Sequence, residues 1–322
     1  MKLSFCIPTL NRPEYLINTI RSICIENYSS QFEICIYNNS SNHNYIDVEE
    51  EIKILSQKFN IKYKKGTSRL EIDQSMFEAI NLAVGDYLFL IGDDDYLLSD
   101  GLSSIIDLID GNDFDLAIFN ALILNEKNKT LTKMFNVSDI YYFDLKKSLI
   151  VLKNYCSYGN ILIKCNFINV NDFHYLEGTS HAYGCFWLSF FKNYEIGIEP
   201  KVIISNSDVV CLRAIAKTYN LLQVTFEHSQ KEFSLYYNYI GPKSTNILKE
   251  YEEIFWNEQS GFFKLFKYGM AGNKLLKIRD YNSFFYKKYF IRIISINVLV
   301  IVFKPFKKIL KFLMLINAKK YP

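Results

Sequence analysis

Short apolar runs that end in polar or acidic clusters recur along the first 125 residues. The runs at 2–8, 32–37 and 86–91 each end in such a cluster, and segments with helical apolar spacing lie between them. Apolar runs of this length predict buried strands, and strands that alternate with helices predict βαβ units around a parallel sheet. We therefore expect an α/β fold whose strand ends gather these polar clusters along one rim.

The same pattern predicts the remaining elements. The expected strands are 2–8, 32–37, 61–64, 86–91, 115–120, 160–163 and 202–204. The expected helices are one that begins at Pro13, then 47–59, 72–83 and 146–153, and one around Trp187. Proline suits the first position of a helix because its missing N–H is not needed there.

The run at 86–91 stops abruptly at three consecutive carboxylates, Asp93, Asp94 and Asp95, just after Gly92. Glycine lets the chain turn at the carboxyl end of a strand, where open α/β sheets bind their ligands. Adjacent carboxylates repel one another unless a cation is present, and oxygen ligands suit Mg²⁺ or Mn²⁺ that carries substrate phosphates. Taken alone, the triplet is equally compatible with a solvated acidic turn.

Composition indicates how large a hydrophobic core the chain can form and in which redox compartment we expect it. The chain has 322 residues, 49% hydrophobic and 22% charged, which is enough to bury the core of one large domain. Its seven cysteines include no C-x-x-C pair, so we expect neither a zinc site nor a disulfide framework. The apolar run before Pro8 is too short for a signal peptide, and we expect a reducing cytoplasm.

The charge is divided unevenly along the chain. Residues 262–322 carry 14 Lys or Arg and one acid, a net charge of +13, whereas the rest carries 23 Lys or Arg and 33 acids, a net charge of −10. A helix that begins at Pro305 has one apolar and one basic face, which predicts attachment to an anionic membrane surface. The alternative is a terminal helix docked on the domain. No nucleic-acid-binding motif accompanies the charge.

Several ordered motifs lie in the first 125 residues. They are Ile7-Pro8-Thr9-x-Asn11-Arg12, Glu33-Ile34-x-Ile36-x-Asn38-Asn39-Ser40-Ser41, Asp73, and Ala83-x-Gly85-Asp86-Tyr87-x-x-x-x-Gly92-Asp93-Asp94-Asp95. These motifs resemble those of the family 2 glycosyltransferases with the GT-A fold. Within that family, the chain looks most like the abequosyltransferase-type enzymes of bacterial surface polysaccharides.

The resemblance implies a Rossmann-like, mostly parallel sheet flanked by helices, and the charge and apolar spacing of the later residues add a helical, basic C-terminal extension. It implies a GT-A domain at 1–215, with a nucleotide-sugar half at 1–125 and an acceptor half at 126–215. A helical segment at 216–261 and the membrane-associating tail at 262–322 would follow.

The resemblance also assigns roles to single residues. Asp95 would ligate Mn²⁺ or Mg²⁺, and Asp93 would bind the ribose of the donor. Asn38 stands where the family usually has an Asp that binds the base, so UDP, CDP and dTDP donors all stay open. The residues that resemble donor-binding positions are Pro8, Thr9, Arg12, Asn38, Asp73, Asp93 and Asp94.

The general base is harder to assign. Many family members place a Glu-Asp pair before a Trp-containing helix, but here Ala182 and Tyr183 occupy those positions. His181 and Glu177 are the alternative candidates, since either could accept a proton from the acceptor hydroxyl. Asp208 is a third candidate.

The resulting hypothesis is a metal-dependent, inverting glycosyltransferase that is peripheral on the inner, cytoplasmic face of the plasma membrane. It would move one sugar from a nucleotide-sugar donor to a lipid-linked oligosaccharide, lipooligosaccharide or capsule acceptor. A nucleotidyltransferase is an alternative, although the segment from Pro8 to Arg12 is not a Gly-rich phosphate loop. The second alternative is a degenerate, non-catalytic GT-A scaffold that associates with membranes.

Overall fold

The computed structural model describes residues 1–126, 128–136, 138–142, 144–149, 157–169, 171, 172, 174, 184–213 and 229–259. The chain forms two compact units. The first unit consists of Met1–Thr218 and Tyr239–Ser244, and the second of Tyr219–Asn238 and Thr245–Pro322. The predicted basic tail at 262–322 lies outside the described residues.

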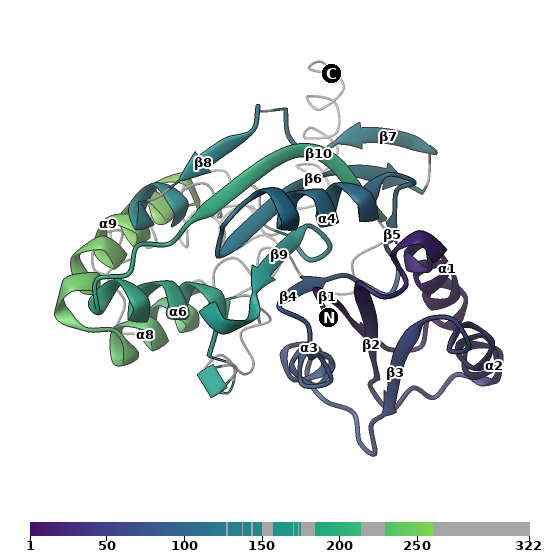
Figure 1. Ribbon diagram of the computed structural model, residues 1–322. Helices are drawn as coiled ribbons and strands as arrows, with labels where there is room; N and C mark the ends of the chain where they lie inside the picture. The colour runs from purple at the N-terminus through teal and green to yellow at the C-terminus, as the bar shows by residue number, and fades with distance from the viewer. Residues whose placement is uncertain are drawn as a thin grey trace, which may run out of the picture. The chain divides into compact units, whose positions relative to one another are not determined.

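One ten-stranded sheet forms the centre of the first unit (Figure 1). Its strand order is β3-β2-β1-β4-β9-β6-β10-β5, with β7 beside β6 and β8 beside β10. The strands are β1 (Leu3–Thr9), β2 (Phe32–Asn38), β3 (Asn60–Lys65), β4 (Tyr87–Leu90), β5 (Tyr96–Leu97), β6 (Leu116–Asn125), β7 (Thr130–Lys133), β8 (Ile140–Tyr142), β9 (Ile161–Lys164) and β10 (Val202–Arg213).

The N-terminal part of the sheet is parallel, as the sequence predicts. β1 pairs in parallel with β2 and β4, and β2 pairs in parallel with β3. β9 then enters antiparallel between β4 and β6, while β10 runs parallel to β6. The expected α/β class is confirmed, and every predicted strand has a counterpart in the sheet.

Helices cover both faces of this sheet. Residues 3, 5 and 7 of β1 lie in one apolar core with α1 (Pro13–Ile23), α2 (Ile46–Leu55) and α4 (Gly101–Gly111). Side chains alternate along a strand, so the residues between them face the other way, toward α3 (Ile72–Ile80). The central strands β1, β2 and β4 are therefore buried on both faces, which explains why they are continuously apolar.

A buried carboxylate fixes the amino ends of the central strands. Glu33 on β2 accepts hydrogen bonds from Ser4 Oγ at 2.7 Å and from the Val84 N–H at 2.6 Å, and it pairs with Lys62 Nζ at 2.8 Å. Burial opposes the charge, but the bonds from Lys62, Ser4 and Val84 hold the pKa of Glu33 below its usual value. The network thus joins β1, β2, β3 and the segment that enters β4.

Some elements differ from their predicted lengths. α2 and α3 end at Leu55 and Ile80, a few residues earlier than the sequence predicts. β10 runs on from Val202 to Arg213 because irregular pairing with β6 between Ser205 and Val210 accommodates a polar stretch. Asp208 therefore lies inside a strand, where its carboxylate pairs with Lys133 Nζ at 3.1 Å.

Most of α8 (Ser229–Tyr239) and α9 (Pro242–Gln259) belongs to the second unit. The Phe233 ring lies 5.4 to 5.9 Å from the rings of Tyr251, Phe255 and Trp256, so aromatic side chains pack between these two helices. In the part of the chain that the structure describes, no helix is both long and apolar enough to cross a membrane.

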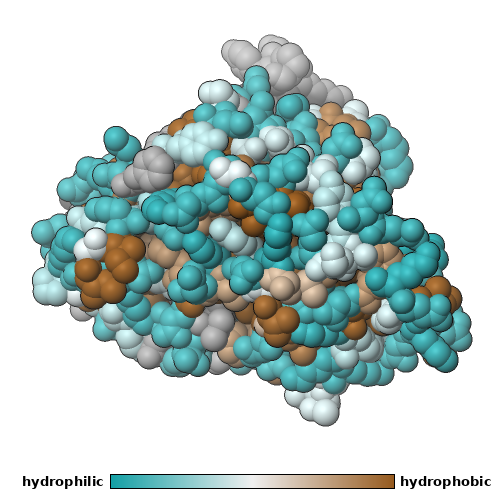
Figure 2. Space-filling model, viewed as in Figure 1, coloured by the Kyte–Doolittle hydropathy of each residue, from teal (hydrophilic) through white to brown (hydrophobic). Residues whose placement is uncertain are grey.

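The view in Figure 2 shows a largely hydrophilic face on which apolar side chains form small, separate patches. The exposed large apolar side chains of the described residues include Ile54, Val84 and Ile196. They come from different elements, and single exposed apolar residues of this kind are normal on a protein surface.

Candidate functional site

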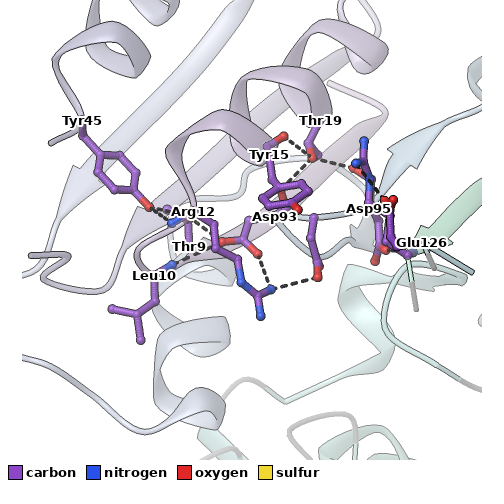
Figure 3. Close-up of polar contacts among 11 residues, drawn as sticks. Thr9, Leu10, Arg12, Tyr15, Thr19, Tyr45, Asp93, Asp95 and Glu126 are labelled. Atoms are coloured by element: carbon purple, nitrogen blue, oxygen red, sulfur yellow. Dashed lines mark hydrogen bonds and ion pairs between the residues drawn. The ribbon is translucent and has the colours of Figure 1, made fainter. Parts of the chain in front are cut away.

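The acidic triplet follows β4 at the carboxyl end of the sheet, beside the loop that leaves β1. Asp93 lies against this loop: its Oδ2 accepts hydrogen bonds from Thr9 Oγ1 at 2.8 Å and the Leu10 N–H at 3.3 Å. Its Oδ1 lies 3.2 Å from Arg12 Nη1 (Figure 3). The structure thus brings together three residues that the family resemblance assigns to donor binding: Thr9, Arg12 and Asp93.

Asp95 contacts the end of β10 rather than the loop after β1. Its Oδ1 accepts a hydrogen bond from the Arg213 N–H at 3.0 Å, and its own N–H donates to the Gly92 carbonyl at 3.3 Å. The residue is 8% exposed, and burial, aided by the charge of Asp94, raises the pKa of Asp95 to about 7.

Two carboxylate oxygens border the same space above Gly92. A Cβ atom on Gly92 would lie 2.8 Å from Asp95 Oδ2 and 3.0 Å from Asp94 Oδ1, so a side chain there would crowd both. No cluster of three or more metal-ligating residues occurs in the described ranges. Magnesium usually needs only one or two carboxylates, because water and substrate phosphates complete its shell. Asp94 and Asp95 therefore fit a cation that arrives with a diphosphate.

Helix α1 and Tyr45 hold the backbone of the site in place through hydrogen bonds. The Thr19 hydroxyl lies 2.9 Å from the Asp93 carbonyl and 2.5 Å from the Asp95 carbonyl, which ties the triplet backbone to α1 (Figure 3). The Tyr45 hydroxyl is 2.8 Å from Thr9 Oγ1 and accepts from the Arg12 N–H at 3.1 Å. The loop after β1 is thereby fixed on two sides.

Asn38, at the end of β2, is fully buried. Its Oδ1 accepts from the Ser41 N–H at 3.0 Å, and its Nδ2 donates to the Tyr63 hydroxyl at 2.8 Å. Asn11, in the left-handed region with φ 58°, accepts from the Asn42 N–H at 2.8 Å and links the loops after β1 and β2. In this arrangement the Asn38 side chain organises its own loop, and its contact with the donor base stays a prediction.

The other predicted donor residues lie close to these loops. Pro8 pairs in register with Tyr37 near the end of β1. Asp73 lies on the first turn of α3 and is 3% exposed. Asn39 joins the loop after β2 to the segment before α3, because its amide exchanges two hydrogen bonds with the Leu70 backbone, at 2.7 and 2.9 Å.

Three residues of the site, Thr19, Tyr45 and Arg213, were not predicted from the sequence. Thr19 left a weak signal, a polar residue on the apolar face of its helix. Arg213 left no signal, because it lies far from the triplet in sequence. Its guanidinium lies 5.1 Å from the Tyr15 ring and 5.2 Å from the Tyr96 ring, and its Nη1 lies 3.3 Å from the Glu126 carboxylate.

The proposed general bases, Glu177 and His181, lie outside the described residues. The helix expected around Trp187 is present as α6 (Gly184–Glu195). The paired Asp208 is the third candidate, and its environment on β10 is given above.

We predict that the metal-free protein becomes more stable as the pH falls from 8 to 5.5. Burial raises the pKa of Asp93 to about 6 and that of Asp95 to about 7, against 3.8 for an ordinary Asp. The folded state therefore binds more protons than the unfolded state in this window, and Asp95 alone contributes about 2 kcal/mol. Urea unfolding in the presence of a chelator, at both pH values, measures the gain, and Asp95→Asn should remove most of it.

Comparison with known proteins gives a family and a fold. The model of the family "Glycosyl transferase family 2" matches residues 4–170. The abequosyltransferase RfbV of Salmonella typhimurium is 36% identical over 113 residues, which are 34% of this chain and 33% of that protein. The match thus spans about a third of the length of this relative.

Solved structures of S. aureus TarS have a similar fold. TarS residues 1–349 in complex with UDP-GlcNAc align with a TM-score of 0.62 and 14% identity, over 82% of this chain and 75% of that one. The same region in complex with UDP aligns with a TM-score of 0.59 and 14% identity, over 82% and 74%. The predicted GT-A fold is confirmed by this likeness together with the sheet order.

Proposed function

The chain belongs to glycosyl transferase family 2, and from this premise we propose that it transfers one sugar from a nucleotide-sugar donor to a glycan acceptor. The observation that carries the proposal is the acidic triplet at the carboxyl end of β4, with Asp93 held by the loop after β1 and Asp95 fixed by the Arg213 N–H. This is the edge where open α/β sheets bind ligands.

In the proposal, the loops after β1 and β2 hold the nucleoside. Asp93 binds the ribose, while Thr9 and the Leu10 N–H keep its carboxylate oriented. Pro8 and Asn38 lie beneath the base, and Asp73 supports the same side from α3. The resemblance suggests these roles. The hydrogen bonds that join the loop after β1, the loop after β2 and the segment before α3 support a single preformed site.

Asp95, assisted by Asp94, would hold Mn²⁺ or Mg²⁺ together with the donor diphosphate. When bound, such a cation neutralises the negative charge that develops on the departing nucleoside diphosphate. The Arg213 N–H fixes Asp95 Oδ1, which leaves Oδ2 directed toward the space above Gly92.

We further propose that the reaction inverts the anomeric centre. A single base would deprotonate the acceptor hydroxyl on one face of the sugar while the nucleotide leaves from the other. His181 and Glu177 stay the two candidates for this base.

The acceptor in our proposal is a lipid-linked or surface glycan, and the enzyme works as a peripheral protein on the cytoplasmic face of the plasma membrane. The match to an abequosyltransferase supports a role in polysaccharide synthesis. The charge of residues 262–322 supports an anionic membrane partner. UDP is the favoured donor nucleotide because a protein of similar fold binds UDP-GlcNAc, with CDP and dTDP as alternatives.

Binding of nucleoside diphosphates in the presence of Mn²⁺ tests the proposal. We expect one of UDP, CDP and dTDP to stabilise the full chain against thermal unfolding, by about 2.7 kcal/mol at a hundred times its Kd. The matching nucleoside without phosphates, at the same concentration, is the control and should give a much smaller shift. If none of the three diphosphates binds with or without Mn²⁺, the proposed donor is wrong.

A further inference from the structure

We infer that Arg12 makes metal binding and donor binding depend on each other, because its guanidinium occupies the acidic triplet until a diphosphate draws it away. This inference rests on the proposed function, since it concerns the same donor site. In this inference Arg12 acts on the cation through the carboxylates and on the donor through its phosphates.

One nitrogen of Arg12 bridges two of the three carboxylates. Nη1 lies 3.2 Å from Asp93 Oδ1 and 2.9 Å from Asp94 Oδ2 (Figure 3 shows the Arg12 side chain directed at Asp93). Arg12 makes no hydrogen bond to Asp95. The Asp93 side chain is 8% exposed and that of Asp94 is 18% exposed, so water reaches neither carboxylate freely. Arg12 supplies the positive charge that pairs with both of them.

The Arg12 backbone is fixed but its side chain can change partners. Its N–H donates to the Tyr45 hydroxyl and its carbonyl accepts from the Leu16 N–H, both at 3.1 Å. The side chain is 36% exposed. Within the described part of the chain, Nε and Nη2 of Arg12 make no hydrogen bond, so the edge of the guanidinium formed by these two nitrogens is unused.

That unused edge matches a phosphate, because two parallel N–H groups can bind two oxygens of one phosphate group. A divalent cation that arrives alone meets the positive charge of Arg12 and carboxylates that are already paired. A nucleoside diphosphate supplies new acceptors for Arg12 and releases Asp94 and Asp93. Each ligand must then favour binding of the other by the same factor, because such coupling is reciprocal.

Titration of Mn²⁺ into the full-length protein tests this inference, with free Mn²⁺ followed by electron paramagnetic resonance. Without nucleotide, Arg12→Gln should bind Mn²⁺ about tenfold more tightly than the wild type, because one nearby positive charge is lost. The matched control is Arg21→Gln on α1, the helix that Arg12 precedes; it loses only a surface pair with Glu51 and should bind Mn²⁺ like the wild type.

A second arm adds saturating UDP, CDP or dTDP in turn. The nucleotide that binds should tighten Mn²⁺ binding by the wild type, and by a smaller factor in Arg12→Gln. Arg12→Lys keeps the charge but has no planar edge, so it should bind Mn²⁺ alone as weakly as the wild type while the gain from nucleotide falls. This variant also answers the question if Arg12→Gln does not fold.

Two results would overturn the inference: nucleotide-free Mn²⁺ binding that is no tighter in a folded Arg12→Gln than in the wild type, or binding by Arg12→Lys that is tighter than in the wild type. Failure of all three nucleotides to bind the wild type is a different result. It rejects the proposed function, whereas the nucleotide-free comparison still shows whether Arg12 competes with a cation.

Discussion

Sugar transfer by the Asp95→Asn variant is expected to fall about a thousandfold, which is the scale seen when a group that stabilises developing charge is removed. Asparagine has nearly the same shape and can still accept the Arg213 N–H, but it lacks the negative charge that would hold a divalent cation. Transfer from the identified donor, followed as released nucleoside diphosphate over a range of Mn²⁺ concentrations, measures the loss.

The stability of the same variant distinguishes a lost charge from a lost fold. Asp95 is buried and its pKa is raised, so replacement by a neutral side chain should leave the free energy of unfolding unchanged or higher at pH 8. Asp107→Asn, on the exposed face of α4, is the matched control and should retain full activity. Normal turnover by folded Asp95→Asn would remove Asp95 from the proposed metal site.

The Gly101→Ala variant is expected to lose about 3 kcal/mol of stability, the upper end of the range for overpacked sites. Gly101 begins α4 where that helix meets β10, and a Cβ atom there would lie far inside contact distance of the Val209 carbonyl oxygen. That oxygen cannot easily retreat, because it accepts the Leu98 N–H at 3.0 Å. Urea unfolding gives the free energy directly.

Gly111→Ala provides the control on the same helix. No atom lies within 4 Å of a Cβ atom built on Gly111, so the substitution should be neutral or stabilise by 0.4 to about 1 kcal/mol. Equal effects of the two substitutions would show that helix propensity dominates at these sites and that the contact between α4 and β10 is not tight.

The sequence predicted the donor side of the fold well because its signals are local. Each apolar run reports one buried strand, and the polar residue types at the strand ends report the rim. The residues Thr9, Arg12 and Asp93 were expected near one another, and the structure joins them by hydrogen bonds and an ion pair. Parallel strands separated by helices leave few other arrangements, which is why short-range patterns were sufficient here.

Other features depend on pairings between distant segments and left no readable pattern. Nothing in the run at 160–163 indicates that β9 enters antiparallel between β4 and β6. The polar stretch from Ser205 to Asp208 hid the continuation of β10, because irregular pairing is not visible in hydrophobic periodicity. Arg213 was missed for this reason, although its backbone supports Asp95.

The side-chain partners within the site were also beyond the sequence. Residue type indicates that Arg12 can bind a phosphate, but it cannot show that the same group lies between Asp93 and Asp94 in the absence of one. Similarly, residue type indicates that Asn38 can bind a base, but it cannot show that both ends of its amide contact the protein. Competition between internal and external partners is decided by geometry.

The bond between Arg213 and Asp95 joins residues 118 positions apart, so the order of synthesis matters. Ribosomes add about 5 to 20 residues per second, and the acidic motif therefore emerges roughly 6 to 24 s before its backbone donor. During that interval β5 also lacks its partner strand, β10. A nascent chain that contains Asp95 but not yet Arg213 therefore lacks the backbone donor that fixes this carboxylate, and the proposed cation site can be complete only after Arg213 has been added.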